Sequence, residues 1–192
     1  MVYMKKIILL VGVVVFSTFI HASSEIEDKQ NAFNMVKQYS GLVSCMSSFE
    51  KNPENGRPTT IKDVTTVNYD ENNNEYVFFV LWVGDMGCLG GSGTISSFVT
   101  EVARHGGDWK PYTIQTDFAF GQNVDINYGY IESIKKINAN KFEVISWDHA
   151  DSKYGGVDGG SNFPANKFKY TVEREGYSGW RVTHQTLLEQ RK

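Results

Sequence analysis

Residues Glu75 to Val83, EYVFFVLWV, constrain the fold of this chain more than any other stretch. The segment is nearly all apolar and contains several aromatic and β-branched side chains. Such a run is typical of a strand that is buried on both faces, because a strand with one face in water would alternate apolar and polar residues. We therefore expect a central strand here.

Strand patterns also fill most of the chain on both sides of this run. In residues 167–173, apolar Phe168, Tyr170 and Val172 alternate with polar side chains, which predicts a half-buried strand. Asn138-Ala139-Asn140 lies between two strand patterns and indicates a hairpin. The other predicted strands cover residues 61–69, 94–104, 112–120, 128–137, 141–147 and 180–188. Helical patterns do not alternate with these strands, which argues against a parallel sheet.

One helix is predicted ahead of the strands, at residues 24–47. Ser24 and Glu27 form a capping box at its start. Apolar residues recur at helical spacing and are expected in the core: Ile26, Phe33, Val36, Val43 and Met46. The predicted fold class is α+β, with an N-terminal helix packed on a mainly antiparallel meander sheet of about eight strands. A small β-barrel or curled sheet is the alternative.

The first 22 residues have the layout of a secretory signal peptide. Two lysines precede an uncharged run of 14 residues, Ile7 to Ile20, and small polar residues follow. A membrane-spanning helix needs about 20 residues, so this run is too short for one. We expect cleavage close to Ala22. Residues 23–192 would then form a single exported domain, periplasmic or secreted, without a stable membrane anchor.

Charge and cysteine content narrow the class of protein further. Loss of Lys5 and Lys6 leaves 17 basic residues against 22 acidic ones, a net charge of −5. An acidic chain without a basic stripe argues against nucleic acid as a partner. Cys45 and Cys88 are the only cysteines, and an even number in an exported chain predicts a disulfide. This bond would stabilise the fold by about 3–4 kcal/mol.

The stretch VGDMGCLGGSGT, residues 83–94, combines Cys88 with five glycines. A phosphate-binding P-loop requires a lysine where Gly93 stands, and a helix should follow instead of β-branched residues. The serine-hydrolase motif G-x-S-x-G also fails, because Thr94 replaces its last glycine. Neither the sequence of this loop nor the scattered histidines assign a catalytic residue.

A loop held by a disulfide and presented to a partner fits this stretch better. A restrained loop loses less entropy on binding, which raises affinity. The predicted binding loop comprises Asp85, Met86, Gly87, Leu89, Gly90, Gly91 and Ser92, with Asp85, Met86, Leu89 and Ser92 as exposed tips. The alternative is structural, since the glycines would also allow a sharp bend beside the disulfide.

A second glycine-rich loop, residues 148–163, carries several polar side chains. The candidate residues there are Asp148, His149, Asp151, Tyr154 and Asp158. Their spacing does not match a calcium-binding loop, and one histidine is too few for zinc. We therefore expect neither a metal site nor a cofactor.

These patterns favour an exported binding protein, an inhibitor or immunity-type protein that engages another protein through the loop around Cys88. One alternative is a hydrolase with an unrecognised active site between residues 84–93 and 148–163. Another is a structural component of the cell envelope, in which the glycine-rich loop would be ordered and buried.

Overall fold

The computed structural model describes residues 24–51, 57–90, 94–106, 111–157, 164–176 and 179–191. The predicted signal peptide therefore lies outside the described residues. The same holds for Gly91 and Ser92 of the predicted binding loop and for Asp158 of the second loop.

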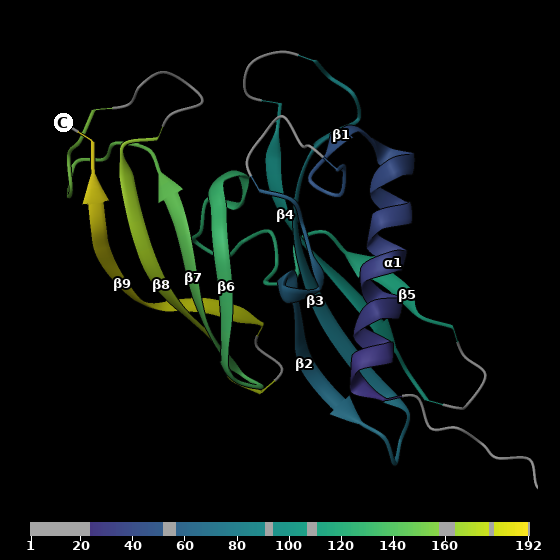
Figure 1. Cartoon of the computed structure of the whole chain (residues 1–192). Coiled ribbons are helices and arrows are strands. Elements are labelled where there is room, and N and C mark those ends of the chain that lie inside the picture. Colours follow the sequence, from purple (N-terminus) through teal and green to yellow (C-terminus); the bar gives the residue numbers. More distant parts are fainter. Residues whose placement is uncertain are drawn as a thin grey trace, which may run out of the picture.

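The described chain forms one α-helix and nine strands, in which two antiparallel sheets follow each other along the sequence (Figure 1). Helix α1 comprises Glu25–Val43. The first sheet contains β1 (Ser44–Ser47), β2 (Val64–Asp70), β3 (Glu75–Met86), β4 (Ser96–Arg104) and β5 (Thr113–Thr116). The second contains β6 (Ile131–Asn138), β7 (Lys141–Asp148), β8 (Asn166–Arg174) and β9 (Trp180–Gln190). Short 3₁₀ helices span Ile61–Asp63 and Tyr128–Tyr130.

This architecture confirms the α+β fold class, but the strands form two sheets and not one meander. Neither sheet closes on itself within the described residues, so the alternative of a small barrel is wrong. The break falls after β5, which ends at Thr116 although the sequence predicted a strand to residue 120. The segment that follows places Phe120, Val124 and Ile126 in the core between the sheets. Before it enters this core, the segment keeps one isolated bridge to the first sheet, between Phe118 and Val99 of β4.

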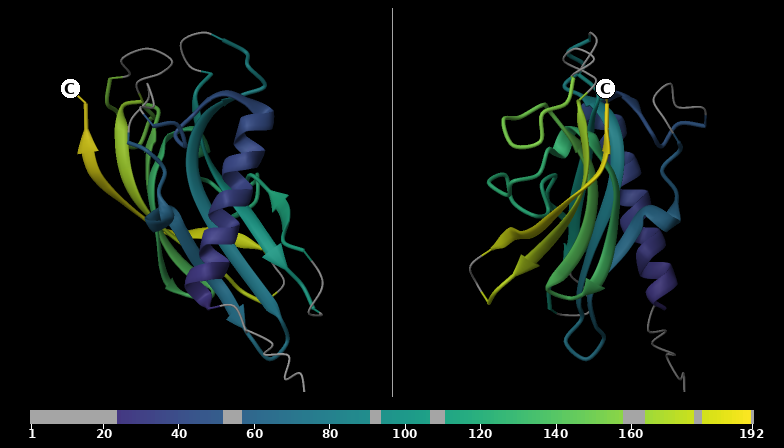
Figure 2. Two further views of the ribbon diagram at one scale, coloured as in Figure 1. Left: turned by 45° about the vertical axis from the view of Figure 1, so that its right-hand side comes forward. Right: turned by 90° about the vertical axis from the view of Figure 1, so that its left-hand side faces the viewer.

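Strand β3 lies at the centre of the molecule, as its sequence predicted. It pairs with β4 along one edge, and with β2 and then β1 along the other. Phe78, Val80 and Trp82 pack towards α1, whereas Phe79 and Leu81 pack between the two sheets. Figures 1 and 2 show the resulting layers, with α1 lying along the first sheet on the side away from the second. Both faces of β3 are therefore buried.

The start of α1 follows the predicted cap, but its first turn does not bury the predicted residue. The hydroxyl oxygen of Ser24 accepts a hydrogen bond from the backbone nitrogen of Glu27 at 3.3 Å. Ile26, expected in the core, is 77% exposed. Asp28 is buried instead, because the phenol groups of Tyr69 and Tyr112 both donate to its carboxylate.

The end of the predicted helix is also different. Residues 44–47, including Met46, form strand β1, which pairs with β3 at Ser44–Met86 and Ser47–Gly84. Gly84 makes this pairing possible, since a Cβ atom there would lie 2.5 Å from the Trp82 ring and 2.8 Å from the Ser44 hydroxyl oxygen. The open edge of β3 and the Cys45–Cys88 bond thus outweigh the helical periodicity of the segment.

The second sheet agrees with the sequence most closely. Asn138 and Lys141 pair where β6 turns into β7, which confirms the predicted hairpin. In β8, Phe168, Tyr170 and Val172 are buried while their neighbours are more exposed, as the alternation predicted. Strand β9 is the free edge of this sheet on one side and β6 on the other.

Candidate functional site

The predicted disulfide is present and joins β1, which directly follows α1, to the loop after β3. The sulfur atoms of Cys45 and Cys88 are bonded, and their Cα atoms lie 5.0 Å apart. A disulfide indicates an oxidising, non-cytoplasmic setting. The loop is also held by a backbone hydrogen bond of 2.7 Å from the nitrogen of Gly87 to the carbonyl oxygen of Val43. Figure 1 shows this loop at the end of the molecule where α1 ends.

Asp85 is not an exposed tip of the loop, contrary to the sequence prediction. Its residue is 3% exposed because β3 continues to Met86, three residues beyond the predicted end of the strand. The Oδ2 atom accepts a hydrogen bond of 3.3 Å from the backbone nitrogen of Gly90. The Oδ1 atom has no hydrogen-bond partner among the described residues. Asp85 therefore holds the loop through its hydrogen bond to Gly90. Because its side chain is buried, it is not available to a partner in this conformation.

Met86 is likewise no tip. It ends β3, is partly buried and packs against the hydrophobic cluster beneath α1. The chain turns only after it, at Gly87, whose φ of 79° lies in the left-handed region that glycine adopts without strain. The exposed described part of the loop is thus residues 87–90.

Leu89 fulfils its prediction as an exposed tip, since it is 76% exposed. Leu42, in the last turn of α1, is 86% exposed at the same end of the molecule. Leu42 was not among the residues predicted from the sequence. Its position beside the predicted apolar stripe of the helix, and not within it, indicates an exposed side chain. We call Leu42, Cys45 and residues 87–90 the disulfide tip. It presents two leucines on a covalently restrained base.

The second glycine-rich loop is held in a turn by hydrogen bonds among its own residues. The Oδ1 atom of Asp151 accepts hydrogen bonds from the backbone nitrogens of Lys153 at 2.8 Å and Tyr154 at 2.6 Å. Tyr154 packs edge to face against Phe168, with ring centroids 4.9 Å apart. Tyr154 therefore belongs to the edge of the core and does not stand out from the loop.

Asp148 and His149, the carboxylate and imidazole of the hydrolase hypothesis, have separate surroundings. Asp148 accepts hydrogen bonds from the His149 backbone nitrogen at 2.8 Å and from the Tyr170 hydroxyl at 3.4 Å. Burial and the charge of Asp148 raise the pKa of Tyr170 above its usual value, so this phenol stays neutral. The exposed His149 ring lies edge to face with Tyr130, at 6.2 Å between centroids. The His149 ring therefore has an aromatic neighbour at the surface.

The described residues contain no group of three or more His, Cys, Asp or Glu side chains arranged to hold a metal ion. No helix among them is both long enough and apolar enough to cross a membrane.

Comparisons with known proteins return nothing that resembles this chain. No family model, curated protein or solved structure matches it. A functional assignment therefore depends on the geometry described above.

Proposed function

We propose that this chain is an exported protein-binding domain, an inhibitor or immunity-type protein, that contacts another protein through the disulfide tip. The observation that carries the proposal is the exposure of Leu42 and Leu89, which lie three residues before Cys45 and directly after Cys88 in the sequence. The disulfide supports a location in the periplasm or outside the cell, where such a bond persists.

The tip has the properties that make a small apolar surface useful for binding. Burying a leucine side chain is worth about 1.5–3 kcal/mol, so two leucines offer a substantial part of a binding energy. The disulfide and the Gly87–Val43 hydrogen bond restrain the loop before it meets a partner, which lowers the entropy lost on association. An envelope component with a buried loop would not leave Leu89 in solvent.

Affinity capture with tip variants tests this function. The oxidised mature domain is immobilised and exposed to periplasmic and secreted extracts of the source cells, and the retained proteins are identified by mass spectrometry. We expect a stoichiometric partner whose retention falls more than about tenfold in Leu42→Asp and Leu89→Asp, since a charge placed in an apolar contact loses its burial energy.

Ile26→Asp is the matched control, because Ile26 is an equally exposed apolar residue at the opposite end of the same helix. It should retain the partner as the unchanged protein does. Equal retention by all three variants would refute binding through the tip.

A further inference from the structure

A cavity of about 510 Å³ lies between the segment that follows β5 and the start of β9. In the right-hand view of Figure 2, this segment and the β8–β9 hairpin lie on the same side of the molecule. The residues that line the cavity are Thr116, Phe118, Ala119, Phe120, Gly121, Gln122, Asn123, Val124, Gly179 and Trp180. None of them carries a charged side chain. Sites for small ligands are concave, mostly apolar and of this size, so the lining suits an uncharged molecule.

One wall of the cavity is held by Tyr128. The Tyr128 hydroxyl accepts a hydrogen bond of 3.0 Å from the Phe120 backbone nitrogen and donates one of 3.3 Å to the Gly121 carbonyl oxygen. Its ring packs edge to face against Phe118, with centroids 5.1 Å apart. Phe120 itself is buried in the core between the sheets. The wall is therefore formed before a ligand binds, which lowers the entropy cost of binding.

Trp180 forms another part of the lining and is also held in place. Its ring packs against Phe120 and Phe142, at 5.5 and 5.3 Å between centroids. The Arg174 guanidinium lies 4.8 Å from the centre of the same ring. These contacts fix the orientation of the indole group at the cavity.

The indole nitrogen of Trp180 differs from those of the other tryptophans that the structure describes. The Trp82 nitrogen donates to the Thr100 hydroxyl at 2.8 Å, and the Trp147 nitrogen donates to the Glu132 carboxylate at 2.6 Å. The Trp180 nitrogen has no hydrogen-bond partner among the described residues, and it is not enclosed in the protein. A tryptophan N–H in a largely apolar site usually finds a partner, so this donor is available to a ligand.

Two side-chain amides at the same cavity are available as well. Gln122 and Asn123 are exposed, and neither amide makes a hydrogen bond within the part of the chain that the structure describes. Each amide offers two N–H donors and a carbonyl acceptor. Hydroxyl groups both donate and accept, so they match this combination.

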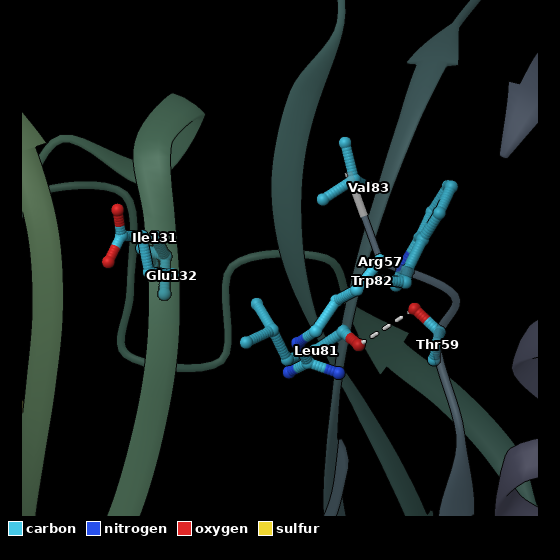
Figure 3. A pocket seen from close by; sticks show the side chains of 7 residues that line it. All are labelled: Arg57, Thr59, Leu81, Trp82, Val83, Ile131 and Glu132. Atoms are coloured by element: carbon cyan, nitrogen blue, oxygen red, sulfur yellow. Dashed lines mark hydrogen bonds between the residues drawn. The ribbon is translucent and has the colours of Figure 1, made fainter. Parts of the chain in front are cut away.

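In the cavity shown in Figure 3, between β3 and β6, the polar side chains are already paired. The Thr59 hydroxyl donates to the Leu81 carbonyl oxygen at 3.4 Å, and the Arg57 guanidinium binds Asp63. Glu132 pairs with a lysine of β8. A polar ligand there would have to displace these contacts, whereas the cavity at Trp180 offers groups that are not yet paired.

We propose that the cavity at Trp180 binds a neutral saccharide. A sugar ring presents C–H groups on its faces and hydroxyl groups around its rim, which fits aromatic side chains beside unpaired amide and indole groups. The C–H groups contact Phe118 and Trp180. The hydroxyl groups pair with the amides of Gln122 and Asn123 and with the indole N–H.

An ionised ligand is disfavoured, because it would lose hydration without meeting an opposite charge in the lining. The cavity shares no residue with the disulfide tip, so saccharide binding is independent of the function proposed for the tip.

The test titrates three neutral disaccharides, N,N′-diacetylchitobiose, maltose and cellobiose, into the ¹⁵N-labelled oxidised domain. We expect at least one of them to cause saturable shifts in the Trp180 indole N–H signal and in the side-chain amide signals of Gln122 and Asn123. The indole signals of Trp82 and Trp147 should not move, since both groups are paired elsewhere. The affinity should be the same at low and high salt, because no charged group takes part.

Gln122→Ala and Asn123→Ala should each weaken the binding about three- to tenfold, because each removes hydrogen bonds to the ligand. Gln38→Ala, the loss of an exposed amide on α1, should leave the affinity unaltered. The proposal is overturned if none of the disaccharides binds at millimolar concentration, or if the Gln122 and Asn123 variants bind as the unchanged domain does. It is also overturned if a neutral, capped dialanine peptide shifts the same signals with equal affinity.

Discussion

The two glycine-rich loops, residues 87–90 and 148–157, differ in whether their large side chain is exposed or packed against the core. Leu89 of the first loop stands in solvent, whereas Tyr154 of the second packs on Phe168 at the edge of the core. The first loop is held by the Cys45–Cys88 bond. The second loop has no cysteine and is held by side-chain hydrogen bonds to its backbone. In the first loop the disulfide supplies the restraint, and the apolar side chain of Leu89 stays exposed. In the second loop, which has no disulfide, the aromatic side chain of Tyr154 packs against the core and helps to hold the loop.

Asn166 and Gln190 supply the contacts that hold the second loop. The Asn166 amide nitrogen donates to the Gly155 carbonyl oxygen at 2.8 Å, and the Gln190 amide nitrogen donates to that of Tyr154 at 2.7 Å. Gln190 also donates to the Asn166 side-chain oxygen at 2.9 Å. Asn166 is fully buried, so this network is protected from water.

The largest effect should come from removing the disulfide. In the double variant Cys45→Ser, Cys88→Ser, the free energy of unfolding should fall by about 3–4 kcal/mol, because a closed loop no longer restrains the unfolded chain. Urea denaturation measures this change, and hydrogen exchange should quicken at residues 87–90 but not at 148–157. A loss below about 1 kcal/mol would mean that the backbone bonds hold the tip by themselves.

Asn166→Ala should have the next largest effect and should act on the second loop alone. It leaves buried backbone and side-chain groups without partners, which costs about 2–3 kcal/mol. Asn138→Ala, in an exposed turn, is the matched control and should cost less than about 1 kcal/mol. Equal costs for the two variants would show that the second loop does not depend on its buried amide.

Tyr154→Ala and Leu89→Ala sharpen the comparison directly. Loss of the half-buried tyrosine should cost about 2 kcal/mol, whereas loss of the exposed leucine should change the free energy of unfolding by less than about 0.5 kcal/mol. Thermal and urea unfolding of both variants provide the measurement. A large cost at Leu89 would place it in the core and remove it from the proposed binding surface.

A smaller effect than that at Tyr154 is expected at Tyr39, in the C-terminal half of α1. Tyr39 donates a hydrogen bond of 2.6 Å to Asp117, and burial together with this bond and the Asp117 charge raises the pKa of Tyr39 to about 12. Since the folded pKa exceeds the unfolded value of 10.0, this contribution is complete below pH 10 and is lost as the pH rises towards 12. Other tyrosines titrate in the same range, so the comparison must be with Tyr39→Phe. That variant should be less stable by about 1 kcal/mol at pH 8 and should show a smaller loss between pH 10 and 12.

Several features could be predicted because they depend on local pattern. The apolar run of β3 has no polar face, so it had to be buried on both sides. Two cysteines had one available pairing within the chain, and the Cys45–Cys88 bond confirms it. The exposed position of Leu89 followed from the glycines around it. The fate of Asp85, in contrast, depended on where β3 ends, and strand ends are poorly defined by local composition.

The sequence by itself determined the fold class, the central strand, the disulfide and the half-buried pattern of β8. Each of these depends on residues close in sequence or on the chemistry of one residue type. Only the tertiary structure decided that residues 44–47 leave the helix, that Asp85 and Tyr154 are turned inwards, and that the strands divide into two sheets. Those outcomes depend on contacts between distant segments, such as the open edge of β3 and the Phe168 ring, whose burial and hydrogen-bond energies exceed local preferences of a few tenths of a kcal/mol per residue.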